Sequence, residues 1–381
     1  MQYRSVGRLD FKVSALGFGT MRLPIIGKDQ SQVDETESIK LLRYAIDQGV
    51  NYIDTAYPYH EGQSEVVVGK ALTDGYRQKV KIATKMPIFY VNKKTDLDGF
   101  FETQLKRLNQ DFIDFYLFHA LNNELWKKVQ DFGMIEWAEK KIAEGKIGYL
   151  GFSFHDEYDV FKEIVDSYNW AMCQIQYNYL DENYQAGKKG LKYAASKGIA
   201  VSIMEPLAGG LLAVNPPEEI RNQWSSAPKK RSAADWALTW IWNHPEVSVA
   251  LSGMGSMRQL QENLQTANHS APNSLSIKEL EMVSKARDLY LEYGYIGCTG
   301  CRYCAKCKQG VDIPAILALL NESARKRRFP KFQEEIKRKY AETVPEEKRA
   351  NNCLHCGACE AICPQRLPIR KLLAEAASSL G

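Results

Sequence analysis

The sequence predicts an α/β protein: a closed barrel of eight parallel strands and eight helices, the (β/α)8 or TIM barrel, followed by a small, mainly helical domain. Short apolar runs recur eight times through the first 290 residues, and segments with helical periodicity separate them. The composition then changes, and eight of the nine cysteines lie beyond that point. We therefore predict two domains, 1–290 and 291–381.

The apolar runs have the length of buried parallel strands. The predicted strands are 15–18, 51–54, 81–84, 114–118, 147–152, 172–176, 200–204 and 247–251. Alternation without internal hairpins favours a closed barrel over an open doubly wound sheet, and the absence of Gly-x-Gly-x-x-Gly after the first strand counts against a Rossmann fold. The first thirteen residues predict a small hairpin across the opposite mouth of the barrel.

Helical periodicity and stop signals predict the intervening helices. Clear examples are 38–48, which Gly49 ends, 97–108, 233–243, 257–267 and 277–292. The longest irregular stretch is 205–230, rich in proline and glycine, and it follows the seventh strand. A long loop at that end of a barrel is usually functional.

The charge is mild overall but uneven. The net charge of +4 does not imply a nucleic-acid partner, no run of eighteen apolar residues predicts a membrane span, and residues 1–8 lack the apolar stretch of a signal peptide. We therefore expect a cytoplasmic protein. Residues 291–381 carry 16 Lys and Arg against 10 Asp and Glu. This excess has two interpretations: a cationic shell around anionic metal clusters, or a solvated basic helix around Arg325–Arg328 and Lys337–Lys339.

Four polar side chains follow three successive predicted strands. Asp54 and Tyr59 follow the second strand, Lys85 the third and His119 the fourth. The carboxyl ends of barrel strands meet at one mouth, where such barrels carry their chemistry. Each residue alone could be a cap, a packing residue or a rim residue. All four at one rim predict an active site.

These residues carry a family resemblance. The strings GVNYIDTAYPY at 49–59, ATK at 83–85 and YLFH at 116–119 resemble the catalytic pattern of the aldo-keto reductases, and the resemblance extends over residues 1 to about 290. It implies that Tyr59 is the general acid, that Lys85 and Asp54 perturb it, and that His119 orients a substrate carbonyl. An ammonium beside a phenol lowers the phenol's pKa from ~10, which suits proton transfer to a developing alkoxide.

Two glycine-containing loops follow the seventh and eighth strands, at 207–211 and 252–256, and the second opens a helix. Such loops bind phosphate through backbone amides and the helix N-terminus. The predicted nicotinamide-nucleotide residues in them and in the helix are Leu207, Gly209, Gly253, Ser256 and Arg258.

The resemblance adds four more residues to the nucleotide site. Ser153 and Gln174 would hold the nicotinamide carboxamide, and Glu262 and Asn263 would contact adenine. The sequence departs from the family where Lys and Arg usually grip a 2′-phosphate, because Gly253 and Gln259 stand there. Arg258 could substitute, and NADP(H) and NAD(H) both remain open.

The eight cysteines of the C-terminal segment form two groups of four. They are Cys298, Cys301, Cys304 and Cys307, then Cys353, Cys356, Cys359 and Cys363. Zinc is one interpretation, since four-cysteine sites suit it. However, the second group reads Cys-x-x-Cys-x-x-Cys-x-x-x-Cys-Pro, the run of bacterial ferredoxins, which favours 4Fe-4S clusters. The ninth, Cys173, is predicted to be a packing residue.

The resemblance to two-cluster ferredoxins implies how the cysteines divide. Cys298, Cys301, Cys304 and Cys363 would hold one cluster, and Cys353, Cys356, Cys359 and Cys307 the other. The first run departs from the pattern, with two residues rather than three before Cys307 and with Lys308 where proline is common. One cluster or two is therefore open, with two favoured.

The predicted function is an NAD(P)H-dependent reductase that transfers hydride between nicotinamide and a small carbonyl or alcohol substrate, fused to a 4Fe-4S electron-transfer domain that could serve a redox partner protein. Hydride transfer moves two electrons while clusters pass one, and no flavin site is recognisable to convert between them. The alternative is an electron-transfer or redox-sensing subunit whose barrel binds nucleotide without turnover.

Overall fold

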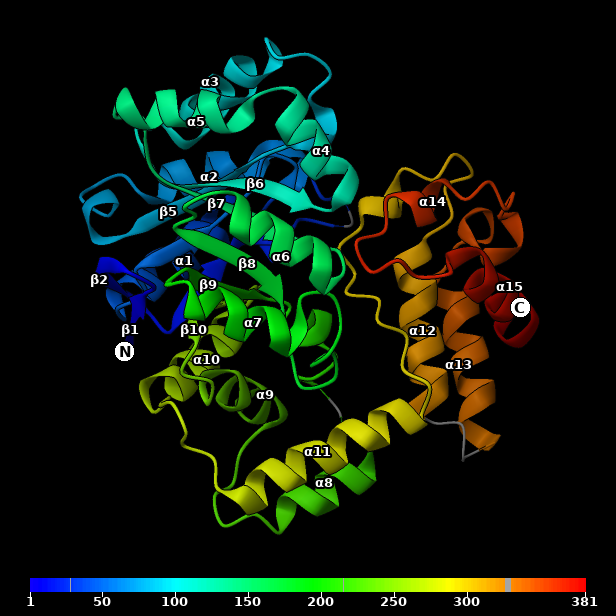
Figure 1. The fold of residues 1–381 in the computed structure, drawn as a ribbon. Helices are drawn as coiled ribbons and strands as arrows, with labels where there is room; N and C mark the ends of the chain where they lie inside the picture. The colour runs from blue at the N-terminus through cyan, green and yellow to red at the C-terminus, as the bar shows by residue number, and fades with distance from the viewer. Residues whose placement is uncertain (28, 215, 326–329) are drawn as a thin grey trace. The chain divides into compact units, whose positions relative to one another are not determined.

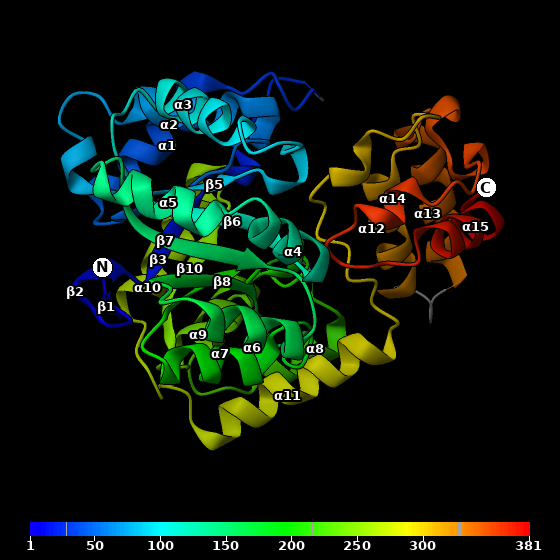
Figure 2. The same cartoon turned by 45° about the horizontal axis from the view of Figure 1, so that its top comes forward.

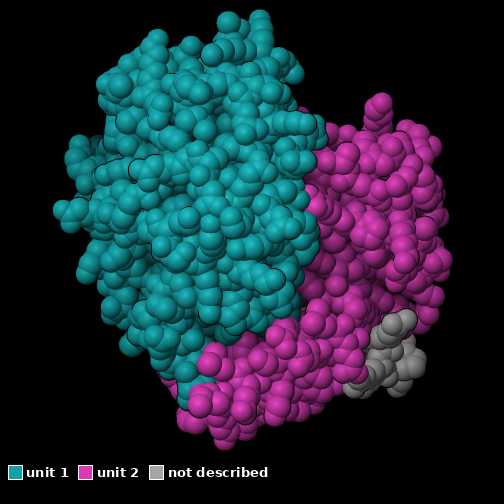
Figure 3. Space-filling model, viewed as in Figure 1, with its two compact units in different colours: residues 1–206, 234–276 teal, residues 207–233, 277–381 magenta. Residues whose placement is uncertain are grey.

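We describe the protein from a computed structural model, which describes residues 1–27, 29–214, 216–325 and 330–381. Packing divides the chain into two compact units, coloured in Figure 3. The first comprises Met1–Pro206 and Ala234–Ser276, and the second comprises Leu207–Ala233 and Ile277–Gly381. The sequence division at 290/291 stays a prediction, because packing places residues 207–233 and the helix that begins at Ile277 with the cysteine-rich segment.

The first unit contains the predicted barrel, which confirms the fold class. Eight strands close in the order β10-β3-β4-β5-β6-β7-β8-β9, and every neighbouring pair is parallel. The strands are β3 (Leu16–Gly19), β4 (Tyr52–Asp54), β5 (Lys81–Met86), β6 (Ile113–Leu121), β7 (Ile147–Phe154), β8 (Met172–Gln176), β9 (Ala200–Met204) and β10 (Val247–Ser252). Each one overlaps a predicted strand.

The predicted N-terminal hairpin is also confirmed. Strands β1 (Tyr3–Val6) and β2 (Leu9–Ser14) pair antiparallel. Val6 and Val13 are fully buried in a core with inward-facing barrel residues such as Phe115 and Met172. Because the Arg8 amide donates to the Gly198 carbonyl, just before β9 begins, the hairpin covers the N-terminal mouth of the barrel.

Helices surround the strands (Figures 1 and 2). In this unit they are α1 (Glu35–Asp47), α2 (Gln63–Ala71), α3 (Asp96–Leu108), α4 (Asn123–Asp131), α5 (Met134–Ala143), α6 (Tyr158–Ser167), α7 (Gly187–Ser196), α9 (Ala233–Trp242) and α10 (Met257–Asn268). The first begins three residues before the predicted helix 38–48, because the Asp34 side chain accepts from the Glu37 amide and caps it.

The second unit is mainly helical, as predicted. Its helices are α8 (Glu218–Ser225), α11 (Ile277–Glu292), α12 (Ile313–Arg325), α13 (Pro330–Thr343), α14 (Ala358–Ala361) and α15 (Ile369–Leu380), with a 3-10 turn η6 (Tyr303–Ala305). Helices α12, α13 and α15 share an apolar core that includes Ile316, Ile336 and Leu373, and six of the cysteines pack against it. The small core is thus continuous with the thiol-bearing segments.

One sequence interpretation is wrong in part. The stretch 205–230 is not wholly irregular, because α8 forms within it and buries Ile220 and Trp224. It packs on α11, and the Gln223 side chain donates to the Met282 carbonyl at 3.0 Å. This helix has only two buried apolar residues, spaced i, i+4. So short a pattern did not reveal a helix in the proline-rich stretch.

The two basic groups predicted in the C-terminal segment lie in different parts of the chain. Lys337–Lys339 lie exposed on α13, as the basic-helix interpretation predicts. Most of the Arg325–Arg328 group lies outside the described residues. In the part of the chain that the structure describes, no helix is long and apolar enough to cross a membrane.

Candidate active site and cysteine sites

The four polar side chains predicted to share a rim do so. Asp54 ends β4, Lys85 lies near the end of β5 and His119 near the end of β6. Tyr59 opens the 3-10 turn η2 (Tyr59–Gly62) that follows β4. Because these three strands are parallel neighbours in the barrel, their carboxyl ends deliver the side chains to one mouth.

An ion pair lies at the centre of this group. Lys85 Nζ donates to Asp54 Oδ1 at 2.7 Å and to the Thr55 carbonyl at 2.7 Å. Both side chains are buried. Burial lowers the pKa of Lys85 and raises the pKa of Asp54, and each partner's charge opposes the shift of the other. The pair therefore holds an ammonium in a place with little water, where its field on a neighbour is strong.

Tyr59 is that neighbour. Lys85 Nζ lies 5.0 Å from the centre of the Tyr59 ring. The rings of Tyr59 and His119 meet edge to face, with centroids 6.1 Å apart. Tyr59 is the most exposed of the four, at 9%. A phenol between an ammonium and an imidazole, at the accessible edge of a buried group, can give a proton to a bound substrate.

His119 is held in its neutral form. Burial lowers its pKa well below the ordinary histidine value, and the charges of Lys85 and His155 lower it further. A neutral imidazole can donate or accept a hydrogen bond without adding a second cation beside Lys85.

The backbone beyond Tyr59 is unusual, and the sequence did not indicate it. His60 and Glu61 both have positive φ, at 52° and 55°. The ring of His60 anchors this turn, because Nε2 accepts from the Leu23 amide at 3.2 Å and Nδ1 lies 3.0 Å from the Gln30 carbonyl oxygen. The loop after β3 therefore stabilises the turn that carries Tyr59.

A second buried carboxylate supports Lys85 from behind. Glu65, on α2, accepts from Thr84 and Gln104 at 2.7 Å each and pairs with Arg107 at 3.2 Å. Gln104 also donates to the Lys85 carbonyl at 3.1 Å. Sequence reasoning missed this network. The available signal was a glutamate in the apolar run around Val66–Val68.

The two residues predicted to hold a carboxamide lie side by side. Ser153 and Gln174 are register partners on β7 and β8, and both are buried. The Ser153 hydroxyl accepts from the Ala120 amide at 2.7 Å, one residue beyond His119. In the described part of the chain, Gln174 Oε1 has no hydrogen-bond partner. A buried acceptor without a partner fits a ligand that brings a donor, such as an amide.

The loop after β10 has the predicted form. Gly253 precedes Ser256, whose hydroxyl caps α10 by accepting from the Gln259 amide. Arg258 is exposed on the first turn of that helix. Glu262 is half-buried, and the Asn263 amide donates to Ser252 at 3.0 Å, so part of its role is to tie α10 to β10.

An ion pair that sequence reasoning missed lies over this loop. Arg22, just after β3, pairs with Glu205 at 3.2 Å. A Cβ added at Gly253 would meet the Arg22 side chain at 3.0 Å, and one at Gly255 would meet the Arg22 carbonyl oxygen at 3.3 Å. The two glycines therefore leave room for Arg22 to lie directly against this loop. From the sequence, the positive charge at this loop was expected to come from Arg258.

Leu207 and Gly209 belong to the second unit. Gly209 has φ of 67°, and a Cβ at this position would lie 2.5–2.8 Å from backbone atoms of Thr299. Thr299 stands between Cys298 and Cys301. The loop at 207–211 is thus packed directly against the first cysteine segment, and only glycine fits.

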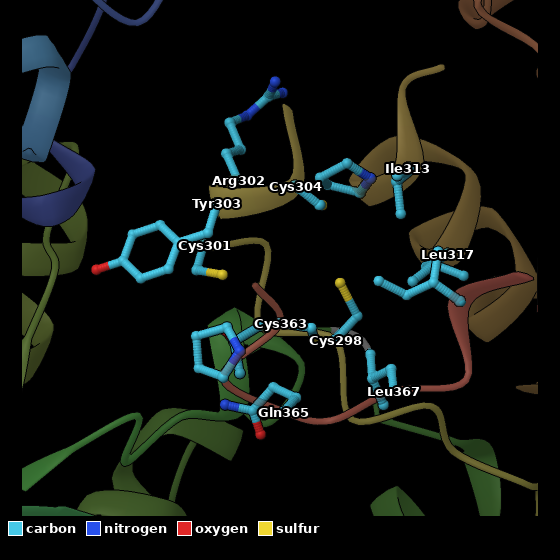
Figure 4. Close-up of a pocket in the computed structure, with 14 residues that line it drawn as sticks. Cys298, Cys301, Arg302, Tyr303, Cys304, Ile313, Leu317, Cys363, Gln365 and Leu367 are labelled. Carbon is cyan, nitrogen blue, oxygen red and sulfur yellow. The ribbon is translucent and has the colours of Figure 1, made fainter. Parts of the chain in front are cut away.

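Three cysteines of the first group and one of the second line a common hollow. Cys298, Cys301, Cys304 and Cys363 line it together with apolar side chains such as Ile313 and Leu317 (Figure 4). Burial and the three neighbouring thiols raise the pKa of Cys304 to about 12. Across the described residues, no three His, Cys, Asp or Glu surround one point as closely as a single ion requires.

The second group is less enclosed. Cys353 and Cys359 are near enough to affect one another electrostatically, and Cys353 Sγ accepts from the His355 amide at 3.4 Å. Cys356 is exposed. Cys307 packs against the small core. Its assignment to this group stays a prediction.

Two family models match the chain. Residues 15–285 match the aldo/keto reductase family, and residues 297–367 match a 4Fe-4S dicluster domain. The chain belongs to the aldo/keto reductase family. A methylglyoxal reductase from Escherichia coli, YeaE, is 30% identical over 73% of this chain and 92% of its own length. The aldo-keto reductase YhdN of Bacillus subtilis is 28% identical over 68% of this chain and 87% of its own.

Solved structures show the same similarity. The holo form of AKR11C1 from Bacillus halodurans, an aldo-keto reductase, is 29% identical, covers 75% of this chain and 96% of its own, and has a TM-score of 0.63. An aldo-keto reductase from Klebsiella pneumoniae, solved with NADPH, is 25% identical over 75% of this chain and 95% of its own, with a TM-score of 0.58.

Proposed function

We propose that this protein reduces a small carbonyl compound with NAD(P)H and that Tyr59 is the general acid. The observation that carries the proposal is the buried Lys85–Asp54 pair, bonded at 2.7 Å, with its ammonium 5.0 Å from the Tyr59 ring. Burial of an ion pair costs desolvation energy, which lowers the stability of the fold unless the pair serves a function. Beside a phenol that must release a proton, it stabilises the phenolate left behind.

Each residue then has a distinct task. A bound nicotinamide would supply the hydride that reaches the carbonyl carbon. Tyr59 gives the proton to the carbonyl oxygen, while neutral His119 donates a hydrogen bond that orients that oxygen. Asp54 keeps Lys85 charged and in place. Preorganised donors of this kind are worth about 3 kcal/mol of transition-state stabilisation each.

The nucleotide residues follow the same proposal. Ser153 and Gln174 would hold the carboxamide. Gln174 Oε1 supports this, because it is a buried acceptor without a hydrogen-bond donor among the described residues. Gly253 and Ser256 would face the phosphates, and Glu262 and Asn263 the adenine, while Leu207 and Gly209 stay predicted nucleotide residues. Arg22 and Arg258 supply positive charge for phosphate groups. Because a relative from Klebsiella was solved with NADPH, we favour NADP(H) over NAD(H).

For residues 291–381 we propose an iron–sulfur domain with two 4Fe-4S clusters, attached to a reductase barrel at 1–290. Cys298, Cys301, Cys304 and Cys363 fit the first cluster because they line one hollow. Cys353, Cys356, Cys359 and Cys307 would hold the second. Free thiols and clusters of this kind suit the reducing cytoplasm.

The reductase proposal is tested with Tyr59→Phe. We expect the variant to lose carbonyl reduction by about 10²–10⁴-fold while its Kd for NADPH stays within twofold, because only the proton donor is removed. Initial rates with an aldehyde panel and NADPH fluorescence titration measure both. Tyr76→Phe is the matched control: its hydroxyl bonds the exposed Asp47 at 2.9 Å, and the variant should keep full activity.

A different result would favour the alternative function. If wild-type protein binds NADPH but reduces no carbonyl under anaerobic conditions with its clusters loaded, the reductase proposal fails. The barrel would then be a nucleotide-binding part of an electron-transfer or sensing subunit.

A further inference from the structure

The second cysteine group lies beside unusually exposed apolar side chains. Leu354, between Cys353 and His355, is 68% exposed, and Ile362, before Cys363, is 51% exposed. Cys356 is exposed as well. Exposed apolar side chains therefore stand near both ends of the second cysteine run, and exposed apolar surface is a feature of interaction sites. A cluster held by these cysteines would lie close to the protein surface.

The surrounding charge is strongly positive. Residues 302–312 and 348–371 hold six of the eight cysteines and carry eight Lys and Arg but only two acidic residues, Asp312 and Glu360. Lys306, Lys308 and Arg366 are exposed. Glu360 is already bonded, because Arg370 donates to it at 2.8 Å through side chain and backbone. Basic residues therefore outnumber acidic ones by eight to two in these segments.

Packing brings these two segments together. Helix α14, which contains Cys359, packs against η6, and Lys306 follows η6 directly. Arg370 lies against the turn of the second run, since its guanidinium carbon is 3.7 Å from a Cβ added at Gly357. We call the exposed set Lys306, Lys308, Leu354, Cys356, Ile362 and Arg366 the basic cysteine surface.

We propose that the basic cysteine surface docks an acidic one-electron carrier protein. The inference rests on the iron–sulfur part of the proposed function, because it needs a cluster held at Cys353, Cys356 and Cys359. An apolar centre with a cationic rim fits a protein with an acidic rim around its own redox centre, and opposite charges speed such encounters. Each encounter moves one electron: the carrier's reduced centre is oxidised and the cluster is reduced, with no bond made or broken.

The test measures electron transfer from a reduced, acidic plant-type ferredoxin to the oxidised, cluster-loaded protein by anaerobic stopped flow. The variant Lys306→Gln/Lys308→Gln/Arg366→Gln should lower the second-order rate constant at least tenfold at low salt and flatten its salt dependence. Leu354→Gln should lower it about threefold at every salt concentration, since it removes apolar contact rather than charge.

The matched control is Lys337→Gln/Arg338→Gln/Lys339→Gln, which removes equal charge from α13. It should keep the wild-type rate with ferredoxin. Methyl viologen radical, a small cation that needs no docking, should reduce every variant at least as fast as wild type. Iron and sulfide analysis on each sample confirms equal loading, and carbonyl reduction by NADPH on the same samples reports the barrel reaction separately.

Several outcomes would overturn the proposal. One is an equal loss of rate in the α13 control, and another is a parallel loss with methyl viologen, which would show altered clusters. A DNA duplex that binds more tightly than ferredoxin at the same salt would replace the protein partner with nucleic acid. If no iron is bound at all, the iron–sulfur part of the proposed function fails first, and the analysis of iron shows it.

Discussion

The barrel mouth and the cysteine segments achieve their arrangement in different ways. At the barrel mouth, Asp54 and Lys85 are placed by neighbouring parallel strands and bonded directly, with Glu65 and Gln104 behind them. The cysteines lie on loops and short turns such as η6 and α14. Four of their thiols border one hollow, and none of the cysteines forms a disulfide among the described residues.

The two sites therefore differ in the interactions that stabilise them. The acid–base pair of the barrel site is held by direct bonds within the protein, between Lys85, Asp54 and the Thr55 carbonyl. The cysteines lie on loops and short turns, so a bound cluster would hold these segments together, and its binding energy would contribute to folding. Substitutions should therefore act on fold and chemistry together in the barrel, and on cluster content in the second unit.

The largest expected effect is on the barrel. Asp54→Asn removes the counter-charge of a lysine that is 1% exposed. We expect carbonyl reduction to fall at least about 100-fold, and the free energy of unfolding to fall by about 3 kcal/mol, since a buried ammonium is left without its partner. Urea denaturation and initial rates measure both.

Glu37→Gln is the control for this variant, because the exposed Glu37–Lys40 pair is on the surface of α1. Its unfolding midpoint should match wild type. An Asp54→Asn protein with unchanged stability and activity would contradict the idea that the barrel site is a single bonded unit.

A smaller effect is expected in the second unit. Gly209→Ala places a Cβ within 2.5–2.8 Å of the Thr299 backbone, so the 207–211 loop and the Cys298–Cys301 segment cannot both keep their positions. We expect a loss of about 2 kcal/mol of stability in this unit and a lower iron content after purification.

Gly294→Ala provides the matched control. It has a similar φ, 73° against 67°, but its added Cβ meets no atom within 4 Å. Backbone strain should be alike in the two variants, and only the clash should differ. Equal iron content in both would show that the packing of Gly209 on Thr299 has no part in holding the cluster.

The smallest effect concerns pH. His119 has a folded-state pKa below its unfolded value near 6.5, so the unfolded chain binds the proton more readily in that range. The contribution of His119 to the free energy of unfolding is therefore complete above about pH 6.5. As the pH falls from there toward the folded-state pKa, the free energy of unfolding decreases by at most about 1.4 kcal/mol per pH unit. His60 and His244 shift the same way and add to the slope.

Comparison with His119→Gln isolates the contribution of this histidine. The variant should show a shallower dependence of unfolding free energy on pH between about 5 and 6.5. Equal slopes in the two proteins would mean that His119 is not held neutral by burial next to Lys85.

The sequence by itself determined the architecture and the acid–base group. Eight short apolar runs separated by helical segments define the barrel, since period and length alone distinguish strand from helix. Strand order then assigns Asp54, Tyr59, Lys85 and His119 to one mouth without any coordinates. The spacing of the cysteines likewise indicated their chemistry, because ligand spacing reflects the size of what is bound.

Only the tertiary structure decided the partners that lie far apart in the chain. Arg22 with Glu205, Glu65 with Gln104, and Gly209 against Thr299 have no fixed sequence spacing, and each depends on how loops fold over strand ends. The same holds for the division into units, where α8 joins α11 across residues that a linear reading assigns to the barrel. Local periodicity records which face of an element is buried, whereas contacts between elements are set by packing, which the linear sequence does not display.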